Sequence, residues 1–149
     1  MISQSMVNNR RLIPIAKAKP KLLIVSDTPE HLINLRAGLS GGEVEITSAT
    51  SAEELRYACH APHDVAVVDV APGRLVNVLR ALRDSEENKN ASVLVETSRL
   101  MPEPGLAGIL PAYRAMPCSN DQLIELTRRR FASLGARLSF KQRMNTRVL

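Results

Sequence analysis

Acidic and hydroxyl side chains that could do chemistry follow three short apolar runs of the chain. Ser26-Asp27 follows LLIV, Asp69 follows VAVV, and Thr97-Ser98 closes the stretch SVLVETS. Carboxylates and hydroxyls are oxygen ligands for hard cations, and a carboxylate can also accept a phosphoryl group. The alternative is that an acidic residue after an apolar run has no chemical role and is a solvated or hydrogen-bonded group at the end of a strand. For Asp69 both interpretations are open at this point.

The elements that must position these groups are short strands that alternate with helices. Thr28-Pro29-Glu30 favours a helix start, and Ser51 with Glu54 has the spacing of a capping box. The apolar runs predict strands at 21–27, 44–48, 64–70, 92–98 and 109–113. The apolar stripes and caps predict helices at 29–39, 52–60, 74–84 and from about 120 to 135.

The segment 99–108 should supply one more helix but contains Pro102, Pro104, Gly105 and Gly108. These residues predict a fourth helix that is shortened or missing. Pro111 lies inside the fifth strand candidate, which therefore fits only the edge of a sheet.

Alternating strands and helices predict an α/β fold in which parallel strands are joined by right-handed crossovers. The expected product is an open, doubly wound five-stranded sheet, with its site beyond the carboxyl ends of the strands. This topology brings Asp27, Asp69 and Thr97 to one edge. We expect Tyr113, which ends the fifth strand candidate, and Met116, which follows it, at the same edge.

The composition predicts one globular domain with basic ends. The chain has 149 residues, 44% of them hydrophobic and 23% charged. Residues 1–21 carry five basic and residues 126–149 seven basic side chains, and all 15 acidic residues lie between these segments. We expect a basic arm at 1–20, a domain at 21–135 and a basic tail at 136–149.

Several function classes are disfavoured by what the sequence lacks. No apolar run approaches the roughly 18 residues of a membrane span, and no signal peptide is recognisable, which predicts a cytoplasmic protein. The two cysteines fit no metal or redox spacing. Aromatic residues make up only 3% of the chain, which argues against stacking on single-stranded nucleic acid. The absence of a glycine-rich phosphate loop and of a nucleophile elbow predicts that the protein is not an enzyme.

Four segments in order resemble the response-regulator receiver domains of two-component signalling, over about residues 20–135: LLIVSDTPE, VVDVAPG, VLVETS and AYRAMP. The resemblance implies a flavodoxin-like sheet of order 2-1-3-4-5. It implies that Asp69 is the phosphoacceptor and that Asp27, with Asp69, binds Mg²⁺. Thr97 looks like the switch hydroxyl and Tyr113 like the switch aromatic.

Two positions depart from the pattern of that family. Ser26 stands where a first acid is expected, and Met116, before Pro117, stands at the lysine position. Phosphoryl transfer to a carboxylate needs charge neutralisation by magnesium and a cation. Losing one carboxylate weakens the magnesium site, and losing the lysine removes a fixed positive charge. The resemblance therefore indicates a degenerate receiver whose switch is incomplete.

Three functions remain open on the sequence. The first is an atypical receiver-like signalling and interaction module that works largely without phosphorylation. The second is a single-domain response regulator that a histidine kinase phosphorylates on Asp69 in a phosphorelay. The third is salt-dependent nucleic-acid binding through the basic ends. A protein partner or a second copy of the chain would bind through the last strand and helix, with these partner-binding candidates: Arg128, Arg129, Arg130, Phe140 and Lys141.

Overall fold

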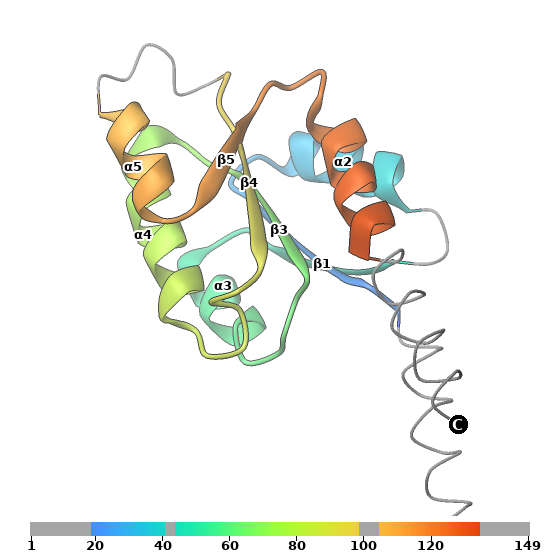
Figure 1. The fold of residues 1–149 in the computed structure, drawn as a ribbon, viewed down its shortest axis with the longest axis horizontal. Coiled ribbons are helices and arrows are strands. Elements are labelled where there is room, and N and C mark those ends of the chain that lie inside the picture. Colours follow the sequence, from blue (N-terminus) through green and yellow to red (C-terminus); the bar gives the residue numbers. More distant parts are fainter. Residues whose placement is uncertain (1–18, 41–43, 99–104, 135–149) are drawn as a thin grey trace, which may run out of the picture.

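A five-stranded parallel sheet forms the centre of the protein (Figure 1). The computed structural model describes residues 19–40, 44–98 and 105–134. The sheet order is β2-β1-β3-β4-β5, and every neighbouring pair is parallel. The predicted α/β class, doubly wound topology and order 2-1-3-4-5 are confirmed. The strands are β1 (Lys21–Ser26), β2 (Glu45–Ala49), β3 (Val65–Asp69), β4 (Ser92–Glu96) and β5 (Ala115–Cys118).

Helices cover both faces of the sheet because its central strands are apolar on both faces. Along β1, Leu23 and Val25 join the core cluster on one face, whereas Leu22 and Ile24 join the cluster on the other. The labelled helices are α2 (Pro29–Leu39), α3 (Ala52–Ala58), α4 (Pro72–Asp84) and α5 (Leu106–Ala112). A C-terminal helix follows at residues 123–134. None of the helices in the described ranges has the length and apolar composition that crossing a membrane requires.

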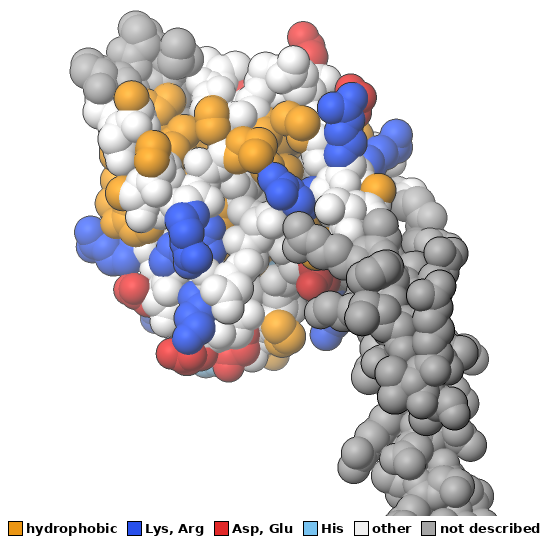
Figure 2. Space-filling model, in the orientation of Figure 1, with side chains coloured by type: hydrophobic (Ala, Val, Ile, Leu, Met, Phe, Trp, Pro, Cys, Tyr) orange, Lys and Arg blue, Asp and Glu red, His pale blue; other side chains and the backbone are white. Residues whose placement is uncertain are grey.

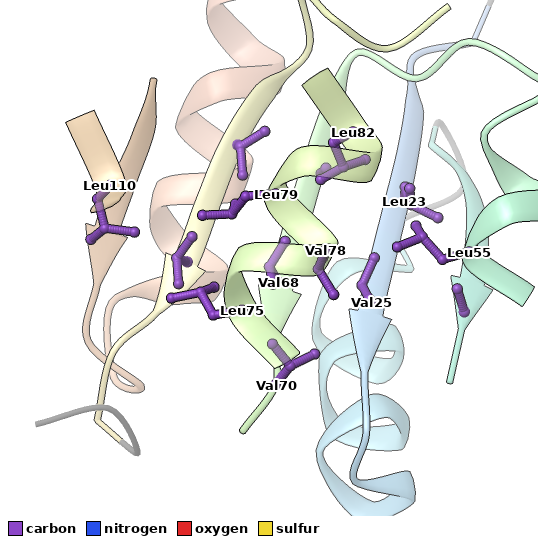
Figure 3. Packing of buried hydrophobic residues seen from close by; sticks show 14 of the residues in the cluster. Leu23, Val25, Leu55, Val68, Val70, Leu75, Val78, Leu79, Leu82 and Leu110 are labelled. Atoms are coloured by element: carbon purple, nitrogen blue, oxygen red, sulfur yellow. The ribbon is translucent and has the colours of Figure 1, made fainter. Parts of the chain in front are cut away.

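The larger core cluster lies between the sheet and the helices α3, α4 and α5 (Figure 3). Leu75, Val78, Leu79 and Leu82 form the buried stripe of α4, as the 3.6-residue period predicts. The second cluster lies under α2 and the C-terminal helix, which contribute these buried residues: Leu35, Leu39, Leu123 and Phe131. The two clusters fix the sheet rigidly and so fix the side chains at its edges.

The predicted fifth strand at 109–113 is wrong, because this segment belongs to α5 and the strand follows at Ala115–Cys118. Leu106 and Leu110, four residues apart, are both buried and give α5 its apolar face. Pro111 is tolerated inside this seven-residue helix, so the fourth crossover helix is short rather than missing. β5 is the edge strand instead, and it contains Pro117, which the edge position allows.

A network of backbone contacts around Arg83 joins the end of α4 to the starts of β4 and β5. Arg83 donates from Nε to the carbonyl of Tyr113 at 2.7 Å and from Nη1 to the carbonyls of Lys89 (2.7 Å) and Ala91 (3.0 Å). Its Nη2 donates to the carbonyl of Arg114 at 3.2 Å. Arg114 has φ of 53°, a conformation that a residue with a side chain rarely adopts. The Arg83 side chain thus holds the tight turn that leads into β5.

The predicted domain boundaries are not tested, since residues 1–18 and 135–149 lie outside the described residues. The basic arm at 1–20, the domain at 21–135 and the basic tail at 136–149 stay predictions.

Candidate functional site

The carboxyl ends of β1 and β3 bring the predicted acids together. Ser26 pairs with Asp69 in the register of the two strands, and the Asp27 N–H donates to the Asp69 carbonyl at 3.3 Å. Asp69 is only 2% exposed, because it ends a strand that is buried on both faces. The position that topology predicted for these two carboxylates is therefore confirmed.

The Asp69 carboxylate contacts a histidine that the sequence reasoning did not select. Nδ1 of His31, in the first turn of α2, lies 2.7 Å from Asp69 Oδ2. The Asp69 side chain is 3% exposed and that of His31 38%, so the pair bridges the buried strand end and the surface. A protonated His31 would form an ion pair with Asp69, and a neutral one would donate a hydrogen bond from Nδ1.

Ser26 adds a hydroxyl to the same carboxylate oxygen. Its Oγ lies 3.4 Å from Asp69 Oδ2 and 3.1 Å from the carbonyl of Thr28, and it accepts the Thr28 N–H at 3.2 Å. The single hydroxyl proton can be donated to only one of the two oxygens at a time. Ser26 therefore contributes a buried hydroxyl dipole at the position where the receiver pattern has an acidic side chain.

Asp27 links two loops at this edge of the sheet. Its Oδ2 accepts the backbone N–H of Ala71 at 2.8 Å, and its Oδ1 accepts the hydroxyl of Thr28 at 3.1 Å. The predicted side-chain cap by Thr28 is absent from this helix start, where Pro29 takes the first helical turn. Asp27 thus holds the loop after β1 against the loop after β3.

The ends of β4 and β5 form the other half of this edge. The N–H and the hydroxyl of Thr97 both donate to the carbonyl of Cys118, at 2.9 and 3.1 Å. Glu96 is buried, and its Oε1 accepts the N–H of Ser98 at 2.8 Å. Thr97 is therefore at the predicted edge, and its hydroxyl donates to the backbone of β5.

Two predicted site residues do not reach this edge. Tyr113 follows α5 and precedes β5, which places it at the opposite, amino-terminal end of the strand. Met116 pairs with Leu94 in the middle of the strands and is 40% exposed. Cys118, paired with Glu96, takes the carboxyl end instead. The expected position was wrong because β5 begins later than the sequence predicted.

The arrangement of donors does not fit a magnesium ion. Mg²⁺ needs several oxygen ligands in near-octahedral geometry. The oxygens of Asp27 face a backbone N–H and a hydroxyl, and Oδ2 of Asp69 faces an imidazole. Within the part of the chain that the structure describes, no group of three or more His, Cys, Asp or Glu side chains could hold a metal. The predicted Mg²⁺ ligands Asp27 and Asp69 are close, but they do not form that site as arranged.

The three predicted partner-binding arginines of the C-terminal helix have different surroundings. Arg128 donates to the carbonyl of Gly38 at 2.6 Å, and Arg129 pairs with Glu125 at 2.7 Å. Arg130 lines a groove beside β5. Phe140 and Lys141 lie outside the described residues.

Raised pKa values predict a low reactivity for the two thiols of the chain, of which Cys118 is buried and Cys59 is partly buried. Burial is the main cause of the raised pKa of the Cys118 thiol. The negative charge of Glu96 raises this pKa further, and the positive charge of Arg130 opposes the rise. Burial also raises the pKa of the Cys59 thiol. A raised thiol pKa means less thiolate, the reactive form, at any given pH. Keeping the neutral thiol buried favours folding at neutral pH, and this contribution is lost as the pH rises through the raised pKa.

We therefore expect iodoacetamide to modify the folded protein at neutral pH much more slowly than the protein unfolded in urea. The rate on the folded protein should rise with pH as the thiolate forms. Intact-mass spectrometry over time measures both rates, with Cys118→Ser and Cys59→Ser resolving the two sites. Equal rates in the folded and unfolded chain would contradict the burial of Cys118 and the partial burial of Cys59.

Comparison with known proteins agrees with the topology. No family model matches the chain, and no curated protein does. Solved structures of receiver domains do match. The chemotaxis response regulator CheY4 of Vibrio cholerae superposes with a TM-score of 0.62 at 22% identity, covering 75% of this chain and 98% of that chain.

Two further structures give the same result. The receiver domain of a sensor histidine kinase from Pseudomonas aeruginosa, with a magnesium ion in its active-site cleft, gives a TM-score of 0.59 at 16% identity, over 76% of this chain and 95% of that one. An adenylate cyclase from Rhodopirellula baltica gives 0.56 at 19% identity, over 83% and 98%. The chain therefore has the fold of response-regulator receiver domains.

Proposed function

We propose that the protein is an atypical receiver-like signalling module that acts through protein binding and largely without phosphorylation of Asp69. The observation that carries this proposal is the 2.7 Å contact between His31 Nδ1 and Asp69 Oδ2 at a carboxylate that is almost fully buried. The receiver fold supports the signalling role. We assign no catalytic activity to the protein.

The contact opposes phosphorylation for two physical reasons. Attack on a phosphoryl donor needs a carboxylate oxygen that the donor can approach in line, but Oδ1 of Asp69 is buried and Oδ2 contacts an imidazole and a hydroxyl. The reaction also needs cations around the transferred group. Ser26 replaces a carboxylate that would help to bind magnesium, and the carboxyl end of β5 carries the neutral Cys118. The His31 imidazole instead occupies the position beside Asp69 Oδ2 from within the protein.

The proposed partners are signalling proteins, such as a histidine kinase, in the cytoplasm. The edge strand β5 and the adjoining C-terminal helix are the proposed binding surface, for such a partner or for a second copy of the chain. Met116 is exposed on this strand, and Arg130 lies beside it. Nucleic-acid binding through the basic ends is the less favoured proposal, because all 15 acidic residues of the chain lie in the body between those ends.

A second candidate function is a single-domain response regulator phosphorylated on Asp69. Its support is the position of Asp69 at the tip of β3, directly beside Asp27 and Ser26 of the neighbouring strand end. For this function the side chain of His31 would have to move away from Asp69, and Mg²⁺ would have to displace the present contacts of Asp27.

Acetyl phosphate with Mg²⁺ separates the two candidates. We expect the wild-type chain to stay unmodified by intact-mass spectrometry. His31→Ala removes the covering imidazole and should raise any labelling. That label should be removed by hydroxylamine, as an acyl phosphate is, and should be absent from the double variant His31→Ala/Asp69→Asn. His60→Ala, which removes an exposed histidine away from the site, is the matched control.

Rapid labelling of the wild-type chain that Asp69→Asn abolishes would overturn the proposed function and establish the second candidate. Amide shifts measured with a beryllofluoride mimic give an independent readout. Under the proposal these shifts are small and confined to the loops around Asp69.

A further inference from the structure

A groove with an all-basic charged lining lies beside the starts of β4 and β5. We call it the arginine groove and define it by Arg83, Ser92, Arg114, Met116, Pro117 and Arg130, which line a volume of about 510 Å³. Its lining residues come from the end of α4, the starts of β4 and β5 and the C-terminal helix. Tyr113, next to Arg114, marks the same amino-terminal end of the sheet. The groove is thus separate from Asp69, which lies at the opposite, carboxyl-terminal end of the strands.

The charged side chains in the described lining of the arginine groove are all positive. Three arginines line it, and none of its lining residues in the described ranges is acidic. The guanidinium groups of Arg83 and Arg114 are close, because both donate to the Lys89 carbonyl at 2.7 Å. Burial, together with the positive charge of Arg114, lowers the pKa of the Arg83 guanidinium. Like charges held together without counter-ions favour the binding of an anionic group.

The three guanidinium groups differ in the donors they can offer to a ligand. Arg83 uses its donors on four backbone carbonyls and contributes mainly charge. Arg114 donates from Nη2 to the carbonyl of Lys89 at 2.7 Å. Arg130 makes no hydrogen bond or ion pair with any other residue that the structure describes, and it is only partly exposed. Its planar donors suit a carboxylate, which they can bind in a bidentate manner.

The rest of the groove is apolar and belongs to an edge strand. Met116 is 40% exposed, and Pro117 is exposed beside it. Figure 2 shows hydrophobic side chains in a band over the face that carries β4 and β5, with Lys and Arg side chains below the band and at its right-hand end. Because β5 is the last strand in the sheet order, an extended segment could align along its outer edge.

We propose that the arginine groove binds an acidic, extended segment of a protein partner. Its carboxylates would contact Arg130 and Arg114, and an apolar residue between them would cover Met116. A protein segment fits better than nucleic acid, because no aromatic side chain lines the groove to stack on bases. This inference rests on the proposed function, since it names the partner chemistry of the interaction module.

A labelled synthetic decapeptide of alternating Glu and Leu tests the groove by fluorescence anisotropy with the full chain. We expect saturable binding at low salt. Arg130→Gln should weaken it by about tenfold, the effect of losing one charge-assisted hydrogen bond. Arg129→Gln is the matched control: it removes the same charge one residue away, from an arginine paired with Glu125, and should change affinity less than about twofold. Met116→Glu, which puts an acid into the groove, should abolish binding.

Each other outcome of this experiment overturns the inference. These outcomes are no binding of the peptide, equal losses for Arg129→Gln and Arg130→Gln, equal binding of the matching Gln-Leu peptide, and tighter binding of an oligothymidylate of similar length. Asp69→Asn should leave peptide affinity unchanged. A negative result in the peptide-binding experiment would therefore not affect the conclusion from acetyl phosphate labelling. Phosphorylation of wild-type Asp69 would likewise not affect the conclusion from peptide binding.

Discussion

Replacing Asn88 by alanine is expected to lower the free energy of unfolding by about 2–4 kcal/mol. The Asn88 side chain has no exposure to solvent. Its Nδ2 donates to the carbonyls of Cys59 (3.4 Å) and Ala61 (3.1 Å) and to Ser85 Oγ (3.1 Å), and its Oδ1 lies 3.0 Å from His63 Nδ1. Alanine would remove all four contacts and leave the buried His63 imidazole without this partner.

The neighbouring Asn90 provides the control for this prediction. Asn90 is exposed in the same loop, so Asn90→Ala should change stability by less than about 0.5 kcal/mol. Urea denaturation followed by circular dichroism measures both variants. A loss below about 1 kcal/mol for Asn88→Ala would mean that the loop after α4 rearranges and supplies new partners.

The second large effect is expected at Arg83. Arg83→Met keeps the apolar stem of the side chain but removes the donors to the carbonyls of Tyr113, Lys89, Ala91 and Arg114. We expect a loss of about 2–3 kcal/mol, because hydrogen bonds from a charged group contribute more than neutral ones, while part of this cluster remains open to water. Urea denaturation of the full chain gives the value.

Arg80→Met is the control for Arg83, since Arg80 is exposed on the same helix. Its effect should stay within about 0.5 kcal/mol. The positive φ of Arg114 gives a second readout, because the turn that Arg83 holds should lose order in the variant. Amide shifts of residues 113–117 that match those of the wild type would argue against Arg83 as the group that fixes this turn.

The first four strands could be predicted because each is an apolar run bounded by polar residues and breakers. The fifth could not, since ILPAY has the composition of a strand as well as of a helix, and burial of Leu106 and Leu110 at helical spacing decides for the helix. β5 itself is only four residues long and contains Pro117, so its local signal is weak. The displaced strand explains why Met116 and Tyr113 were expected at the wrong edge.

The acids of the candidate site could be predicted from topology, because parallel strands end at the same edge of a sheet. His31 could not be selected in this way, since its role depends on a helix side chain turning back onto a neighbouring strand end. A histidine in the first turn after Asp27 was the available signal. Asn88 was likewise hidden, because the loop SEENKN has the composition of a solvated loop although one of its side chains is fully buried.

The sheet order also predicts how amide hydrogens exchange with solvent. β1 and β3 have strands on both sides and buried residues on both faces, so their amides should exchange only when the whole domain unfolds. β5 has one uncovered edge and should exchange through small local openings at a lower free-energy cost. A segment bound in the arginine groove would close that edge, and slowed deuterium uptake at Ala115 and Met116 would record its presence without any label on the partner.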